Sequence, residues 1–124
     1  MTRRLASEEK RARRIARLVA TYCQGAYEHG YAASAFEPAR IVNRAYRKLA
    51  KALERLREME ADWHVHLVPL LDHEDPHIRA WAAVDLYKLF PERARTIMEE
   101  LAARPGTAQF RASNMLDSWN RRSG

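Results

Sequence analysis

The sequence predicts an all-α protein, and three observations carry this prediction. The chain has 124 residues with only 4 glycines and 5 prolines, whereas turn-rich sheet folds need more of both. It is rich in Ala, Arg, Leu and Glu, which favour helices. Its apolar residues recur every three or four positions, which places them on one face of a helix. At this length we expect one domain, residues 1–124, with frayed ends at 1–6 and 120–124.

The first half of the chain predicts two long helices, 8–29 and 38–60. Ser7 is a candidate N-cap of the first helix, and Gly30 is a candidate C-terminal cap before a loop over 31–37. Pro38 suits the first position of the second helix. The apolar faces of the two helices comprise Ile15, Leu18, Val19, Tyr22 and Ala26, and then Val42, Ala45, Tyr46, Leu49, Ala52, Leu53 and Leu56.

The middle of the chain predicts a short helix that follows Asp62 and is kinked by Pro69, because the proline ring clashes with the preceding turn. A further helix begins at Pro76 with Asp75 as its N-cap. The inner face of this helix contains Ile78, Ala82, Leu86 and Leu89. Its other faces are apolar as well, which predicts a helix covered on more than one side.

The last third predicts two helices, one that Pro91 opens and one from about Thr107. The first ends before Pro105 and turns Ala94, Ile97, Met98 and Leu101 inward; the second buries Ala112, Met115, Leu116 and Trp119. The expected fold is therefore an α-α superhelix of about six helices in three antiparallel hairpins.

A resemblance to a known family supports this architecture. Residues 67–89, LVPLLDHEDPHIRAWAAVDLYKL, resemble a HEAT repeat: a Leu-rich helix with Pro69, an Asp-containing turn over 72–75, and a second helix opened by Ile78 and Arg79. Residues 91–119 resemble a degenerate second unit. The stretch NRAYRKL at 43–49 makes the chain similar, over about residues 10–119, to small bacterial HEAT-like proteins known only as a domain of unknown function.

This resemblance implies more about fold than about activity. HEAT-like folds serve mostly as protein-binding scaffolds, and a minority bind or repair DNA. The resemblance also implies that the second helices of the pairs line one side of the superhelix, where partners bind.

Charge points to the N-terminal half as the electrostatic surface. The chain carries 22 basic and 16 acidic residues, a net charge of +6, and residues 1–60 alone carry +7. On the helices predicted over 38–60 and 8–29, basic residues fall opposite the apolar faces and form two ridges. The ridges comprise Arg40, Arg44, Arg47, Lys48, Lys51 and Arg55 on one helix, and Lys10, Arg13, Arg14 and Arg17 on the other.

The ridges leave three interpretations open. They suit nucleic-acid phosphates, an acidic protein partner, or a solvated face without a ligand. Glu37, Glu54 and Glu58 interrupt the ridges. No aromatic residue alternates with the basic ones to stack on bases.

Candidate chemical residues cluster around the turn at 72–75, and their spacing argues against catalysis. Four histidines, at 64, 66, 73 and 77, lie near Asp72, Glu74 and Asp75, but their directions do not converge on a metal. We expect Asp72 and Asp75 to cap the following helix, and Arg79 to pair with the turn of a neighbouring repeat. Cys23 cannot form an internal disulfide and reads as a small core residue. We therefore expect neither enzyme activity, a metal nor another cofactor.

A second candidate surface is apolar. Trp81, Val84 and Tyr87 lie on the far side of their helix, where they either contact a partner or pack between neighbouring repeats. Trp63 and Trp119 are expected in the core.

The sequence as a whole predicts a non-enzymatic, cytoplasmic protein-interaction module without membrane attachment. An unknown protein partner is the leading expectation, and self-association is compatible with it. Nucleic-acid binding through the basic ridges is the alternative, and neutralisation of a toxin's acidic site is a weaker third.

Overall fold

The computed structural model describes residues 3–123, and all the regular secondary structure within them is helical. Five α-helices are present: α1 (Arg3–Ser34), α2 (Ala39–Met59), α3 (Pro76–Leu86), α4 (Pro91–Ala103) and α5 (Gln109–Ser123). Two short 3-10 helices, η1 (Trp63–His66) and η2 (Val68–Asp72), connect α2 to α3. The all-α prediction is confirmed.

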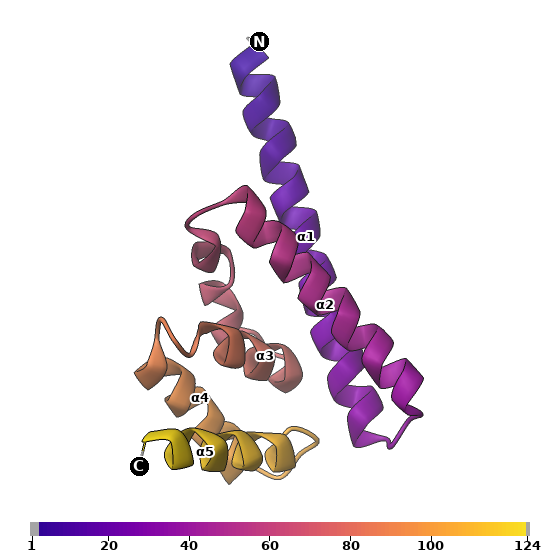
Figure 1. Ribbon diagram of the computed structural model, residues 1–124, viewed down its shortest axis with the longest axis vertical. Coiled ribbons are helices and arrows are strands. Elements are labelled where there is room, and N and C mark those ends of the chain that lie inside the picture. Colours follow the sequence, from indigo (N-terminus) through magenta and orange to yellow (C-terminus); the bar gives the residue numbers. More distant parts are fainter. Residues whose placement is uncertain (1–2, 124) are drawn as a thin grey trace.

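Helices α1 and α2 form a long antiparallel hairpin, and the remaining helices gather beside one part of it (Figure 1). The N-terminal turns of α1 extend beyond α2 and every other element. The core runs from the α1/α2 interface through η2 and α3 to α4 and α5, and its largest fully buried side chains include Tyr22, Leu49, Leu71, Leu86 and Met98. None of the helices described is both long and apolar enough to cross a bilayer.

Helix α1 is longer than predicted, because its glycines serve packing and not capping. A Cβ on Gly25 would lie 2.7 Å from the backbone nitrogen of Leu49, and a Cβ on Gly30 would lie 2.1 Å from Cγ of His77. Both glycines therefore allow a close approach within a continuous helix. The prediction that α1 ends at Gly30 is wrong, and the start predicted at residue 8 lies inside the helix as well.

Helix α1 ends in a Schellman motif, with Phe36 at the position that glycine normally occupies. The amides of Phe36 and Glu37 donate to the carbonyl oxygens of Ala33 and Ala32. Phe36 has a φ of 56°, in the left-handed region that side chains other than glycine seldom adopt. The local sequence therefore carries no glycine signal for this helix end.

The segment around Pro69 is a pair of 3-10 helices and not one kinked α-helix. Proline has no N–H for an α-helical bond to the residue four positions earlier. The amides of Leu67, Leu70 and His73 each donate to the carbonyl oxygen three residues earlier, which belongs to His64, Leu67 and Leu70 respectively. Such bonds define the tighter 3-10 helix.

The predictions for the last three helices are confirmed at their starts and largely on their faces. Asp75 caps α3 by accepting from the amides of His77 and Ile78, and the inward residues predicted for α4 are buried. Met115 and Leu116 are only half-buried. Leu89 lies beyond the end of α3 and is 50% exposed, so its placement in the core was wrong.

The predicted frayed ends are helical over most of their length. Residues 3–6 belong to α1, and α5 continues to Ser123. Residues 1, 2 and 124 of those predicted ends lie outside the described residues.

Candidate functional sites

The predicted basic ridges lie on the outer side of the α1/α2 hairpin, which we call the basic face. Every one of its side chains is exposed except Lys48, which is half-buried. The basic face comprises Lys10, Arg13, Arg14, Arg17, Arg40, Arg44, Arg47, Lys48, Lys51 and Arg55.

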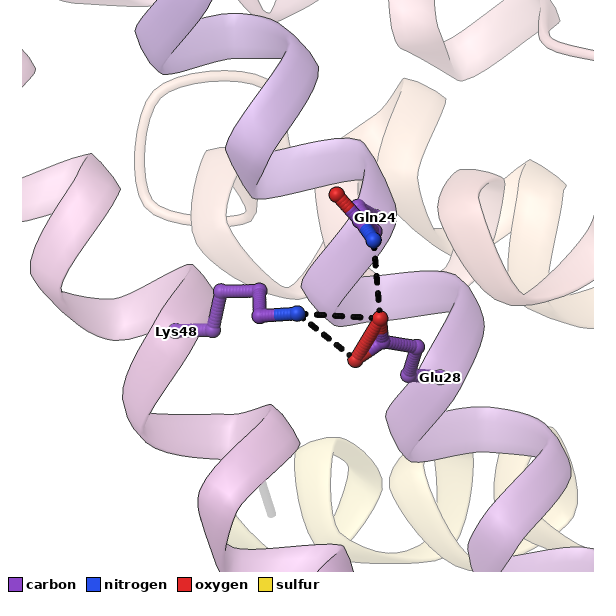
Figure 2. A network of polar contacts seen from close by, with 3 residues as sticks. All are labelled: Gln24, Glu28 and Lys48. Atoms are coloured by element: carbon purple, nitrogen blue, oxygen red, sulfur yellow. Dashed lines mark hydrogen bonds and ion pairs between the residues drawn. The ribbon is translucent and has the colours of Figure 1, made fainter.

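One member of the basic face is committed to an internal ion pair. Lys48 Nζ lies 2.9 Å from both carboxylate oxygens of Glu28, and Gln24 donates to the same carboxylate over 3.0 Å (Figure 2). The pair bridges α2 to α1, so Lys48 stabilises the hairpin contact and contributes little free positive charge.

The register of the hairpin places the two ridges one after the other along its length. Gly25 of α1 packs against Leu49 of α2, and the Arg11 guanidinium donates to the carbonyl oxygen of Met59. In this register Arg17 lies about level with Arg55, so along the hairpin axis the ridge on α1 begins where the ridge on α2 ends. Together the two ridges extend over about 33 Å of this axis at 1.5 Å per helical residue.

Charge is strongly segregated between the hairpin and the rest of the chain. Helices α1 and α2 contain fourteen basic and five acidic residues, a net charge of +9. The rest of the sequence keeps eight basic and eleven acidic residues, a net charge of −3. A segregated charge of this size produces a field that steers an oppositely charged partner to one side of the molecule.

The candidate apolar patch is mostly covered by the chain itself. Trp81 is only 8% exposed, and its ring contacts Tyr46 and His29. Tyr87 stacks on Trp119 with ring centroids 4.0 Å apart, and Val84 packs against the core. The structure thus favours the internal-packing interpretation of Trp81, Val84 and Tyr87 over an exposed patch.

Trp119 and Trp63 both contact the core as predicted. Trp119 is 3% exposed, whereas Trp63 is half-buried beneath the Arg57 guanidinium. Cys23 is half-buried against the core, and burial raises the pKa of its thiol.

The charged residues around the turn at 72–75 have structural partners. Asp72 is exposed and pairs with Arg93 at 2.8 Å, so the prediction that it caps α3 is wrong. Arg79 donates to the carbonyl oxygens of His73 and Glu74. It therefore braces the turn of its own unit, and the predicted pairing with a neighbouring repeat is not found.

The histidines near this turn are dispersed. His66 contacts Glu60, His64 lies between the rings of Trp63 and Phe90, and His73 accepts from the amide of Asp75. No group of three or more His, Cys, Asp or Glu side chains within residues 3–123 is arranged to hold a metal ion.

A buried polar cluster, which the sequence patterns did not indicate, joins α1, α3 and α5. His29 and His77 are both buried, at 8% and 1% exposure. Arg111 Nη1 lies 3.0 Å from Nδ1 of His29, and its guanidinium lies 4.5 Å from the centre of the Trp81 ring. His77 Nε2 lies 2.7 Å from the Thr107 hydroxyl.

The environment of this cluster keeps its histidines neutral. Burial, reinforced by Arg111 and His77, lowers the pKa of His29 to about 4. Burial also lowers the pKa of His77, although Asp75 opposes the shift. The pKa of Arg111 is likewise lowered by burial.

A cavity of about 690 Å³ opens beside this cluster, between the end of α1 and the start of α5. Its walls include His77 and Arg111, together with Phe36 and Phe110. The two phenylalanines are 94% and 78% exposed, the highest values among the large apolar side chains described. Apolar cavities of this size with a few polar groups are typical of small-molecule sites.

Comparisons of the chain with models of protein families, with curated protein sequences and with solved structures find no match. The HEAT-like resemblance of residues 67–89 therefore stays a prediction.

Proposed function

We propose that the protein is a non-enzymatic interaction module, with a HEAT-like helical arrangement, that binds an acidic surface of a partner protein through its basic face. The observation that carries this proposal is the segregation of charge. Helices α1 and α2 carry a net charge of +9, and the exposed outer side of their hairpin presents most of it.

A protein partner fits the basic face better than a nucleic acid does. Glu54 and Glu58 are exposed on α2 next to the basic side chains. A protein surface can oppose them with its own basic residues, whereas a phosphate backbone is uniformly negative and would be repelled.

Charge reversal on the basic face tests the proposal. Arg44 and Lys51 are exposed and have no ion-pair partner among the described residues. The double variant Arg44→Glu/Lys51→Glu should keep the helical circular dichroism of the wild type. It should lose a partner that tagged wild-type protein captures from nuclease-treated lysate at near-equal stoichiometry.

The matched control is Lys88→Glu/Arg104→Glu, which makes the same change in charge at two exposed positions outside the hairpin. We expect this control to retain the partner. Equal capture by both double variants would refute the basic face as the binding surface.

Nucleic-acid binding is the second candidate, and the combined length of the two ridges favours it. An axial length of about 33 Å matches about ten base pairs at 3.4 Å each. For this function, the logarithm of the affinity for oligonucleotides of unrelated sequence falls steeply and linearly with the logarithm of the salt concentration. Capture that disappears after nuclease treatment would favour this candidate over the first.

A further inference from the structure

The cavity between α1 and α5 contains a positive charge without a negative partner. Within the described residues the Arg111 guanidinium makes a hydrogen bond with the neutral His29 ring and a cation-π contact with the face of Trp81. No carboxylate lies within 4.0 Å of its guanidinium among residues 3–123. A guanidinium has five N–H donors, and a partly buried one is normally paired with an anion.

A second polar group, beside the cavity, also lacks a partner among the residues described. His77 is 1% exposed, and its Nδ1 has no hydrogen-bond partner among residues 3–123 although Nε2 contacts Thr107; Nδ1 itself is buried against Gly30 of α1 and does not reach the cavity. Buried polar atoms without partners are uncommon in folded proteins, and each one needs a physical explanation.

The apolar side chains of the cavity wall contribute little to the packed core. Phe36 and Phe110 line the cavity and are the two most exposed large apolar side chains described. Phe36 also holds a left-handed backbone conformation, where glycine would be less strained. A side chain that is both strained and exposed contributes little to the stability of the free protein.

From the position of Arg111 and the two exposed phenylalanines we infer that the cavity binds a small monocarboxylic acid with an apolar body. The carboxylate pairs with Arg111, and the apolar body covers Phe36 and Phe110. A single negative charge matches the single cationic side chain in the cavity wall. Arginine also suits a carboxylate because its parallel N–H groups bond both oxygens.

Binding is tested on the full chain with phenylacetate, 3-phenylpropionate and octanoate, and with phenylacetamide as the uncharged control. Calorimetry measures the affinity, and amide NMR shifts locate the site. We expect at least one carboxylate to bind saturably and to shift the amides of Gly30, Gly106 and Thr107. Phenylacetamide should bind at least about tenfold more weakly than phenylacetate, because it cannot form the ion pair.

Two variants separate ligand binding from folding. Arg111→Gln should weaken the binding of the carboxylates at least about tenfold and leave the affinity for phenylacetamide unchanged. The exposed control Arg104→Gln should change the affinity for neither kind of ligand. Phe36→Gly should raise the melting temperature of the free protein and still weaken binding. The second variant is informative even where the first alters the fold, because glycine suits this backbone conformation.

A peptide with a C-terminal carboxylate presents the same chemistry, so a tripeptide ending in Phe is tested in free and amidated forms. Binding of the free acids supports the proposal, whether or not the peptide also binds. Three results would overturn it: no saturable binding by any of the three acids, equal affinity for acid and amide, or shifts confined to the basic face.

Discussion

At the scale of single residues, glycine does not mark the end of helix α1. Gly30 and Gly25 lie inside α1 because other side chains occupy the space where a Cβ would project. Phe36, by contrast, holds a conformation that suits glycine. A glycine in the sequence therefore predicts a helix end only where no neighbouring helix requires the space of a missing Cβ.

Replacing Gly30 by alanine should destabilise the fold. In an open helix the change stabilises by about 1 kcal/mol, but here the new Cβ would lie 2.1–2.6 Å from side-chain atoms of His77. We expect a loss of about 1–3 kcal/mol, typical of overpacking, measured by urea denaturation. Gly106→Ala is the control because no atom lies within 4 Å of its added Cβ; a stabilised Gly30→Ala variant would contradict the packing described.

The buried histidines should make the protein sensitive to acid. Burial lowers the pKa of His29 from 6.5 to about 4 in the folded chain. Between these values the unfolded chain binds a proton that the folded chain does not. The free energy of unfolding is therefore highest above pH 6.5, and it decreases as the pH falls towards 4. Unfolding free energies measured across this range should fall less steeply in His29→Gln; an unchanged slope would count against a neutral buried His29.

At the scale of elements, one partly buried hydrogen bond joins the hairpin to α3. The hydroxyl of Tyr22 on α1 donates to the carboxylate of Asp85 on α3. Burial first, and then the neighbouring Asp85, raise the pKa of Tyr22 well above its ordinary value. Burial raises the pKa of Asp85, although the Tyr22 bond opposes this shift. An acid inside a largely apolar helix thus acts as a specific contact between elements.

Removing this bond should cost more than an ordinary surface change. Tyr22→Phe leaves the partly buried Asp85 carboxylate without its donor, and we expect a loss of about 1.5–3 kcal/mol. A cycle with Asp85→Asn and the double variant, each unfolded in urea, should show coupling of at least about 0.5 kcal/mol. Purely additive effects would mean that the two side chains do not act as a pair.

At the scale of the whole molecule, the segregated charge should oppose folding at low salt. Helices α1 and α2 carry a net charge of +9, so like charges lie close together along the hairpin. The compensating negative charge lies on other elements. Salt screens such repulsion between exposed groups, with a Debye length of about 10 Å at 0.1 M. The same charge that suits an acidic partner is therefore a cost in the free protein.

Stability should accordingly rise with salt. Increasing NaCl from about 20 mM to about 300 mM should raise the melting temperature of the wild type because screening weakens the repulsion. The rise should be smaller in Arg44→Glu/Lys51→Glu, which removes part of that repulsion. Identical salt responses in the two proteins would show that the basic face is not under electrostatic strain.

Features that depend on neighbouring residues in the chain could be predicted from the sequence, whereas features that depend on packing between helices could not. The starts of α3 and α4 were predictable because Asp75, Pro76 and Pro91 act through their own backbone neighbours. The end of α1 was not, because Phe36 occupies a position where the expected signal is glycine. The exposure of the basic face could be read from helical periodicity alone, whereas its extent along the hairpin required the register of α1 against α2.

The sequence by itself determined the helical content, the principal buried faces and the location of the excess positive charge. These properties depend on interactions within a few residues, or on composition, and so they are written in local patterns. Tertiary structure alone decided the buried cluster and its cavity. His29 and Arg111 are 82 positions apart, and His77 and Thr107 are 30 apart. No local pattern specifies such pairs, because the packing of α1, α3 and α5 creates both their proximity and the burial that changes their chemistry.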